Sequence, residues 1–295
     1  MKVVIVGGSN IDVFAVSDKA IIGYDSNPGK VYEAFGGVGR NIAENLGRLK
    51  CRPTLITAIG KNEIPQFKVH LDAAGVELRA IETKKTSRYI AVLNNDYDMY
   101  VGISAMKVME DLSIHDFKPY IEKIRNADIV VLDTNLEETV FHYLLKQCKN
   151  EIYIDGISTQ KIQKIIPFLD RITVLKLNEL EARSLFSDFK GTRELLIDKL
   201  KDTGINEIYL TVGKEGVYQI IGNNVIHQKL LPIQKAYTTG AGDAFLSGVV
   251  YGKITQKDAL QYGILNARFC LNTLDAVNQE LSIEKLEQLR RELYA

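Results

Sequence analysis

Short runs of apolar, largely β-branched residues recur along the chain and alternate with longer segments of helical periodicity. Strands are expected at 2–6, 54–59, 128–132, 151–155, 172–177 and 207–212. A strand that is apolar at nearly every position is typical of a parallel sheet covered on both faces. Helices are expected at 40–50, 64–74, 113–126, 137–148, 192–203, 241–252, 256–274 and 282–294. The alternation predicts right-handed crossovers and a doubly wound, mostly parallel α/β sheet.

Two segments interrupt this alternation. Residues 13–35 contain the turn cluster 25–29 between extended stretches, and residues 87–104 read as a hairpin around the polar turn 94–98. Together they predict a small antiparallel sheet inserted into the α/β body. Ligands of open α/β sheets bind at the carboxyl edge, so an insertion there suits a lid; an ordinary edge hairpin is the alternative. We expect a single domain over 1–295, with a lid formed by about 13–35 and 87–104.

Composition restricts the classes of function. Of the 295 residues 46% are hydrophobic, and 37 Lys and Arg balance 37 Asp and Glu, which argues against a broad nucleic-acid or anionic-membrane surface. The N-terminal apolar run 2–6 is too short for a signal sequence or a membrane span. The three cysteines and four histidines show no metal-binding spacing. We expect a soluble, cytoplasmic protein that acts on a small molecule.

The segment 238–245, TTGAGDAF, carries the most specific chemistry. It precedes an apolar helical run, so Gly240, Ala241 and Gly242 are expected at a helix N-terminus, where unpaired backbone N–H groups form an anion hole. A carboxylate repels a bound phosphate, so Asp243 is expected to point at a substrate hydroxyl and accept its proton as a general base. The alternative is a glycine turn followed by an ordinary acidic residue in the first helical turn.

Two polar clusters are candidates for a substrate site. The sequence GGVGRN at 36–41 precedes a helix, and a tight turn at Gly37 would direct Asn41 toward a polyhydroxyl ligand, since an amide both donates and accepts. Asn10 and Asp12 follow the first strand, where a carboxylate and an amide can bind paired hydroxyls. Neither cluster matches the dinucleotide or P-loop patterns. Turn and cap roles are the alternatives for both.

Two patterns follow later strands. Asn178 and Glu181 form N-x-x-E after 172–177, and an amide and a carboxylate there can hold the water shell of Mg²⁺. Thr211, Gly213 and Gly216 form T-x-G-x-x-G after 207–212, where glycines let a nucleotide approach the backbone. Each pattern is weak when taken alone.

The order of these motifs resembles that of the ribokinase-like (PfkB) family of carbohydrate and nucleoside kinases, over residues 2 to about 290. The resemblance implies an α/β body with a β lid, ATP and Mg²⁺ as cofactors, and phosphorylation of a sugar hydroxymethyl group. It assigns catalysis to Asp243 and an anion hole to Gly240, Ala241 and Gly242. It further implies substrate contacts at Asn10, Asp12, Gly37, Asn41 and Asn135, ATP contacts at Asn178, Thr211, Gly213 and Gly216, and a water-mediated Mg²⁺ contact at Glu181.

A finer resemblance is to the bacterial pseudouridine kinases of that family, through DSNPGKV at 25–31, GGVGRNIAENL at 36–46 and SRYIAVLNND at 87–96. It implies phosphorylation of a nucleoside 5′-hydroxyl, places Asn27 at the substrate, and is compatible with a homodimer through the lid. Another nucleoside or a free sugar, such as inosine, ribose or fructose, is the alternative substrate. A non-catalytic sugar or nucleoside sensor and a dinucleotide-dependent oxidoreductase are the competing functions.

Two positions depart from these patterns. Tyr237 stands where many family members carry an acid of a monovalent-cation loop, so little dependence on K⁺ is expected. Ala105, in ISAM at 103–106, stands where pseudouridine kinases carry an aspartate, so recognition of the base is expected to differ.

Overall fold

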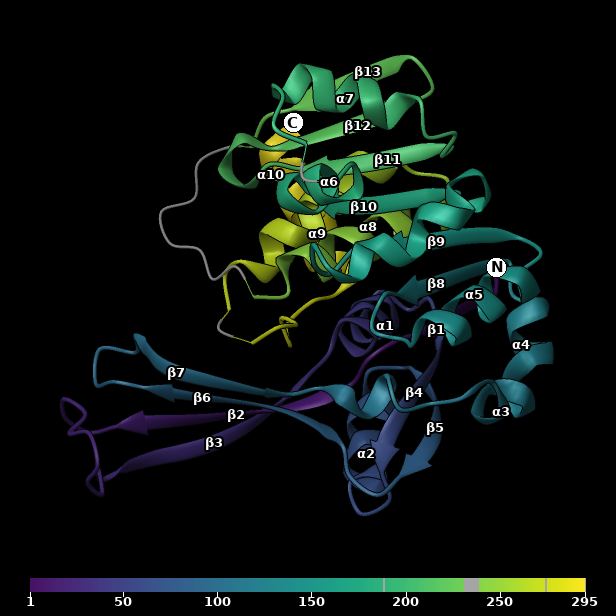
Figure 1. Ribbon diagram of the computed structural model, residues 1–295. Helices are drawn as coiled ribbons and strands as arrows, with labels where there is room; N and C mark the ends of the chain where they lie inside the picture. Colours follow the sequence, from purple (N-terminus) through teal and green to yellow (C-terminus); the bar gives the residue numbers. More distant parts are fainter. Residues whose placement is uncertain (188, 231–238, 274, 295) are drawn as a thin grey trace.

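A nine-stranded sheet, called the large sheet here, forms the body of the protein (Figure 1). The computed structural model describes residues 1–187, 189–230, 239–273 and 275–294. The strands lie in the order β13-β12-β11-β10-β9-β8-β1-β4-β5. The seven from β11 to β5 are parallel, and β12 and β13 add an antiparallel edge. In chain order the strands are β1 (Val3–Val6), β4 (Thr54–Gly60), β5 (Glu77–Thr83), β8 (Ile129–Asp133), β9 (Glu151–Asp155), β10 (Val174–Asn178), β11 (Glu207–Thr211), β12 (Val217–Ile221) and β13 (Asn224–Gln228).

Helices bury both faces of the large sheet. Val4 and Val6 of β1 pack into one hydrophobic core, and Val3 and Ile5 pack into the other, because successive side chains of a strand point to opposite faces. The first core lies under η1 (Lys107–Met109), α3 (Ile114–Phe117), η2 (Lys118–Tyr120), α4 (Ile121–Arg125), α5 (Glu138–Gln147), η3 (Lys161–Arg171), α6 (Glu179–Leu185) and α7 (Arg193–Lys201). The second lies under α1 (Val38–Arg48), α2 (Ile64–Ala73), α8 (Ala241–Ile254), α9 (Ala259–Cys270) and α10 (Ile283–Tyr294). The predicted doubly wound α/β sheet is therefore confirmed.

A second sheet of four strands, called the small sheet here, projects from the body (Figure 1). Its order is β3-β2-β6-β7, with β2 at Asn10–Ser17, β3 at Gly29–Gly36, β6 at Ser87–Leu93 and β7 at Met99–Ala105. Each hairpin is antiparallel, but the central strands β2 and β6 pair in parallel. The predicted small antiparallel sheet is thus present, with one parallel pairing at its centre because both hairpins leave the body in the same direction.

Some elements differ from the sequence-based expectations. Strand β5 was not predicted, because its residues are exposed or partly buried, apart from Ile81, and do not form a continuous apolar run. The β12–β13 hairpin was not predicted either, since β13 is an exposed edge strand. The helix expected at 113–126 is divided into α3, η2 and α4 because Pro119 cannot donate the backbone hydrogen bond that a continuous helix requires. Within the described ranges, no helix has the length and apolarity needed to cross a membrane.

Candidate active site

Polar residues end a series of adjacent strands at the carboxyl edge of the large sheet. Asp133 ends β8, Asp155 ends β9, Asn178 ends β10 and Thr211 ends β11. The register pairs Asp133 with Asp155, and Asn178 with Thr211. An otherwise apolar sheet therefore presents a row of polar side chains along this edge, which is where ligands bind in open α/β folds.

Asp243 lies in the first turn of α8. Gly240, just before the helix, has φ +77°, and a Cβ there would collide with the carbonyl oxygen of Ala276. Glycine is required for this tight entry, which leaves the first N–H groups of α8 without helix partners. The side chain of Asp243 is 8% exposed. Burial, followed by the negative charge of Asp155, raises the pKa of Asp243 to about 7.

Asn41 joins α1 to this carboxylate. Its Nδ2 donates a hydrogen bond of 2.6 Å to Oδ2 of Asp243, across 202 residues of sequence. Its Oδ1 is buried and has no hydrogen-bond partner among the described residues. An acceptor left unpaired beside a buried carboxylate costs free energy unless a ligand donates to it. A polyhydroxyl ligand could supply that donor from a second hydroxyl, next to the one that faces Asp243.

Glycines bring the two predicted substrate clusters together. Gly37 has φ +99°, and a Cβ there would collide with the carbonyl oxygen of Gly8. A Cβ on Gly36 would collide with Asp12 and would lie 2.7 Å from Nδ2 of Asn10. Asn10 and Asp12 share one face of β2, and Nδ2 of Asn10 donates to Oδ1 of Asp12. Burial raises the pKa of Asp12, and the bond from Asn10 offsets part of that rise.

Asn135 lies just after β8, next to the turn at Gly8 that follows β1. Its Nδ2 is 2.9 Å from where a Cβ on Gly8 would stand, and its Oδ1 accepts a 2.7 Å hydrogen bond from Nζ of Lys161. Asp133 holds this region in place, because its Oδ2 accepts from the backbone N–H of both Gly8 and Gly39. The predicted substrate residues, Asn27 excepted, therefore surround the turns at Gly8 and Gly37.

Asn178 and Glu181 form a capping box at the start of α6. The backbone N–H of Glu181 donates to Oδ1 of Asn178 at 2.9 Å, and Asn178 donates to both carboxylate oxygens of Glu181. Burial raises the pKa of Glu181, and the nearby charge of Lys176 offsets part of the rise. Among the described residues, no group of three or more His, Cys, Asp or Glu could hold a metal ion. Asn178 and Glu181 fit a Mg²⁺ ion that keeps its waters, since each carboxylate oxygen of Glu181 has a further lone pair that can accept from a water molecule.

Thr211, Gly213 and Gly216 form the turn between β11 and β12. Gly213 has φ +58° and Gly216 has φ +114°. A Cβ on Gly216 would collide with the backbone of Gln228, whereas the space around Gly213 is open. Thr211 pairs with Asn178 in the sheet, so this turn lies beside the capping box, on the same carboxyl edge.

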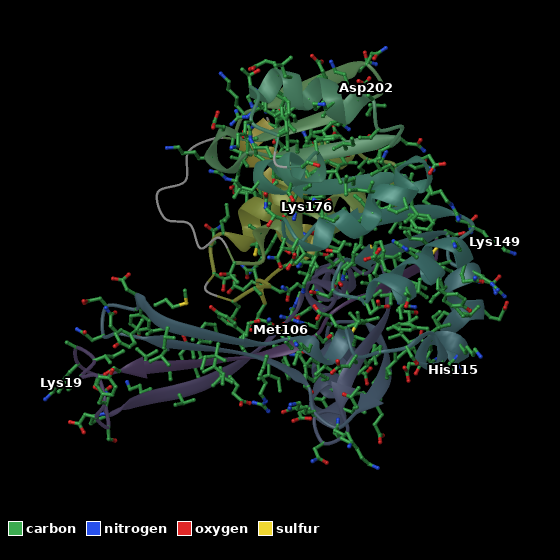
Figure 2. All side chains as sticks on the ribbon, viewed as in Figure 1. Lys19, Met106, His115, Lys149, Lys176 and Asp202 are labelled. Atoms are coloured by element: carbon green, nitrogen blue, oxygen red, sulfur yellow. The ribbon has the colours of Figure 1, made fainter. Side chains whose placement is uncertain are left out.

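The structure does not bring Asn27 to this site. Asn27 lies in the loop between β2 and β3, at the outer end of the small sheet where Figure 2 labels Lys19. Its amide is bonded within that loop, accepting from the N–H of Ile22 and donating to the carbonyl oxygens of Ile22 and Asp25. Tyr237 lies outside the described residues.

Sequence reasoning missed several buried charges. Asp133, Asp155 and Lys176 are buried charged residues at or near the ends of apolar strands. A single charged residue within an apolar run is the sequence feature that could have identified them as site residues. Arg40 was also missed: it is buried, pairs with Glu44, and donates to the carbonyl oxygens of Phe35 and Gly36 at the end of β3. Arg40 therefore ties the small sheet to α1.

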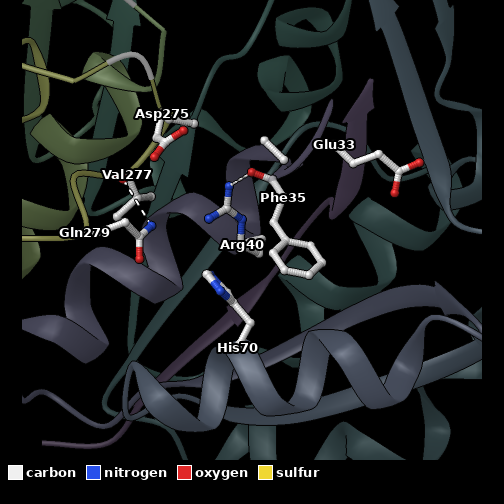
Figure 3. Close-up of a pocket in the computed structure, with 9 residues that line it drawn as sticks. Glu33, Phe35, Arg40, His70, Asp275, Val277 and Gln279 are labelled. Atoms are coloured by element: carbon white, nitrogen blue, oxygen red, sulfur yellow. Dashed lines mark hydrogen bonds between the residues drawn. The ribbon is translucent and has the colours of Figure 1, made fainter. Parts of the chain in front are cut away.

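A cavity of about 190 Å³ lies beside Arg40, between the end of β3, α2 and the 275–279 segment (Figure 3). Phe35, His70, Asp275 and Gln279 contribute to its lining, and none of the predicted site residues does. Arg40 and His70 both bind Glu44 behind it. Burial alone would raise the pKa of Glu44, but the bonds and charges of His70 and Arg40 hold it far below the usual value. The cavity therefore lies where the small sheet meets the body, and the predicted site residues do not line it.

Comparison with known proteins gives consistent matches. A sequence-family profile described as "pfkB family carbohydrate kinase" matches residues 1–271. Pseudouridine kinase of Escherichia coli (strain K12) is 31% identical over 256 residues, covering 84% of this chain and 82% of that protein. Ribokinase of Staphylococcus aureus (strain COL) is 28% identical over 269 residues, covering 84% of this chain and 85% of that protein. The structure of Arabidopsis thaliana ribokinase complexed with ribose and ATP has a TM-score of 0.82 at 21% identity, covering 98% of each chain.

Proposed function

The chain belongs to the pfkB family of carbohydrate kinases and is an ATP-dependent sugar or nucleoside kinase, and we propose that it phosphorylates the 5′-hydroxyl of a nucleoside, with pseudouridine as the substrate. The match to the family profile confirms the resemblance to the PfkB family that the order of the motifs indicates. The nucleoside, the roles of the individual residues, the magnesium ion and the assembly belong to the proposal.

The contact between Asn41 and Asp243 carries the proposal. Asp243 is buried, has a pKa near neutrality, and has beside it the unpaired acceptor of Asn41. A hydroxyl that donates to Asp243 is positioned to lose its proton to that carboxylate, and a neighbouring hydroxyl of the same ligand can donate to Asn41. As the proton moves, the hydroxyl oxygen bonds to the γ-phosphorus of ATP, and the bond from that phosphorus to the β–γ bridging oxygen breaks. ADP leaves with the electron pair.

The start of α8 supplies the complement to this base. The backbone N–H groups at Gly240, Ala241 and Gly242 are available for the oxygens of the phosphoryl group in transit, since Gly240 turns the chain sharply into the helix. Fixed donors of this kind stabilise charge as it develops in the transition state. The remaining hydroxyls of the substrate bind Asn10, Asp12, Gly37 and Asn135, which surround the same turns.

ATP binds along the carboxyl ends of β10 and β11. Asn178 and Thr211 are sheet neighbours there, and the open space at Gly213 allows a phosphate or ribose to approach the backbone. Magnesium, when bound, offsets the negative charge of the triphosphate. Glu181 would hold its water shell through the carboxylate lone pairs that Asn178 leaves free.

Two observations favour pseudouridine over other substrates. The relative of 31% identity is named pseudouridine kinase, and the segments 25–31, 36–46 and 87–96 carry the finer resemblance. The ribokinase relative, at 28% identity, keeps a free sugar as the second candidate. Use of ATP and three free cysteines are both compatible with the predicted cytoplasmic location.

The small sheet is proposed to act as the lid and to form a homodimer. Every residue of the edge strand β7 is exposed, and apolar side chains gather on β3 and β7. A patch of this kind marks an interaction surface, and a second copy of the chain offers the same patch in a two-fold arrangement. The patch consists of Val31, Val101 and Ile103, which share one face of the small sheet: the register pairs Val31 with Ala15, Ala15 with Val92 and Val92 with Val101, and Ile103 is two residues from Val101.

In such a dimer, the outer loop that carries Asn27 lies away from its own Asp243, so Asn27 would meet substrate bound to the other copy. Sedimentation should give a dimer that I103D converts to monomers. If the wild-type protein is a monomer at about 50 µM, the proposed dimer is contradicted, and the kinase proposal is unaffected.

The substrate is tested by ATP consumption on a panel of pseudouridine, uridine, inosine, adenosine, ribose and fructose. We expect pseudouridine to have the highest kcat/KM, by at least about tenfold, or about 1.4 kcal/mol of transition-state binding. A higher value for ribose or inosine would assign the chain to another substrate within the family. Absence of turnover on every compound would favour the sensor function. Retained NAD in the purified protein would be the mark of the oxidoreductase alternative.

A further inference from the structure

One lysine is buried within the large sheet, directly behind the candidate site. Lys176 is the third residue of β10, is 7% exposed, and lies inside the body (Figure 2). Its Nζ is 3.1 Å from both carboxylate oxygens of Asp155, which is 1% exposed and faces it from β9 in the sheet register. Both carboxylate oxygens of Asp155 lie within hydrogen-bond distance of the ammonium, and no hydrogen bond from it to any other group is present among the described residues.

The ammonium also contacts the predicted anion hole. A Cβ placed on Gly242 would lie 2.6 Å from Nζ of Lys176, so the lysine lies against the first turn of α8, and a larger residue at position 242 would displace the ammonium. Lys176 and Asp155 are both close enough to affect Asp243, the next residue, and they do so in opposite senses. The pair is therefore a fixed dipole beside the general base.

Stability does not account for this pair. Removing two charges from water costs several kcal/mol for each ion, and apolar residues of similar volume often replace buried pairs without loss of stability. Val174, two residues before Lys176 on the same face of β10, is apolar and fully buried, so this face of the strand accommodates an apolar side chain. A charge kept at this position indicates a role in the chemistry of the site.

We propose that the Lys176–Asp155 pair positions and tunes the general base: Lys176 keeps Asp243 ionised and holds Gly242 of the anion hole, and Asp155 keeps Asp243 basic enough to accept a proton. Lys176 and Asp155 are positioning residues, because they act through Asp243 and Gly242. The inference rests on the proposed role of Asp243 and is independent of which nucleoside or sugar is the substrate.

Other charged or titratable groups also face Asp243 and are held constant in the test. Arg40 and Asn41 approach from α1, and Cys270 approaches from α9. Glu181 of α6 acts on Lys176. Since Lys176 and Asp155 have opposite charges, their removal must move the proton affinity of Asp243 in opposite directions. Loss of a merely structural pair would not do this.

The experiment measures the acid limb of kcat/KM against pH for the wild type, K176M, D155N and K176M/D155N, at saturating ATP and Mg²⁺. K176M should move the limb upward by about one pH unit, and D155N should move it downward by about half a unit or more. The double variant should lie between the two. It leaves no unpaired charge, so it keeps the test valid if K176M does not fold. K253M is the matched control, because Lys253 pairs with Glu207, which begins β11 at the opposite edge of the sheet.

A limb of D155N within about 0.2 units of the wild type and K253M would overturn the inference, and so would a double variant whose limb lies no higher than that of D155N. Shifts of K176M and D155N in the same direction would also overturn it. D243N separates this from failure of the proposed function. If D243N is inactive and the limbs do not move, only the positioning role is lost. If D243N retains wild-type turnover, the base assignment and this inference both fail.

Discussion

Replacing Asp243 with asparagine removes the proton acceptor and little else. Asparagine has nearly the same size, and its Oδ1 can still accept the hydrogen bond that Asn41 now donates at 2.6 Å. The donors at Gly240–Gly242 are backbone groups and are retained. At neutral pH an amide cannot take a proton, so the substrate hydroxyl loses its general base.

The expected magnitude follows from that limited change. A positioned general base contributes about 10²–10⁴-fold to the rate, so kcat of Asp243→Asn should fall by at least ~10². Substrate and ATP contacts at Asn10, Asp12, Asn178 and Thr211 are untouched, so both affinities should change by less than ~10-fold. The fall in kcat corresponds to about 3 kcal/mol or more of lost transition-state stabilisation.

The assay combines steady-state ATP consumption with calorimetric binding on the folded variant. Asp258→Asn is the matched control: Asp258 caps α9, its Oδ1 accepts from the N–H of Gln261 at 2.9 Å, and asparagine is an equally good cap. Its kcat should be that of the wild type. A kcat for Asp243→Asn within about threefold of the wild type would refute the base assignment and the mechanism built on it.

Four further predictions concern Asp243 and the residues that precede it in the sequence. Because burial raises the pKa of Asp243 to about 7, kcat/KM of the wild type should fall as the pH drops below about 7. Because of the same raised pKa, the folded state binds more protons than the unfolded state between about pH 4 and 7. The free energy of unfolding therefore falls as the pH rises through this range, and the ionised Asp243 costs at most about 4 kcal/mol of stability at pH 8. Asp243→Asn should therefore raise Tm at pH 8 and raise it less at pH 5; a lower Tm at pH 8 would contradict this. With Tyr237 in place of the acid of the cation loop, exchange of Na⁺ for K⁺ should change kcat/KM by less than tenfold, or about 1.4 kcal/mol; a larger K⁺ activation would show that other groups bind the ion. Gly240→Ala should lower both kcat and Tm, by about 1–3 kcal/mol of stability, because it combines a φ of +77° with a collision at Ala276. Gly222→Ala, at φ +55° in open space, is its control and should cost less.

The class of fold was predictable because it depends on local patterns. Apolar runs such as 128–132 and 151–155 are continuous, so they require cover on both faces, and the helical segments between them provide it. Strand β5 and the β12–β13 hairpin were missed for the same reason, since edge strands bury only one face or neither and leave no continuous run. The break in the helix at 113–126 was signalled by Pro119 and was not used.

The site was predictable in its motifs and not in its electrostatics. Glycines that need a positive φ, such as Gly37 and Gly240, identify backbone turns from residue type alone. The pairing of Asn41 with Asp243 joins residues 202 apart, and only the packing of α1 against α8 brings them together. The resemblance implied a substrate contact at Asn27, yet in the structure the amide of Asn27 is hydrogen-bonded to the backbone of its own loop, at the outer end of the small sheet.

By itself, then, the sequence determined the alternation of strands and helices, the glycine turns and the chemical types available at the end of each strand, because these depend on neighbours within a few residues. The tertiary structure alone decided which charges share a low-dielectric space. In the sequence, Lys176 is a single cation within an apolar run. Its proposed role became apparent only in the structure, where the parallel register places Asp155 beside it and the first turn of α8 packs against it. Charge interactions strengthen as water is removed, and the removal of water is a property of the packed molecule and not of any one segment.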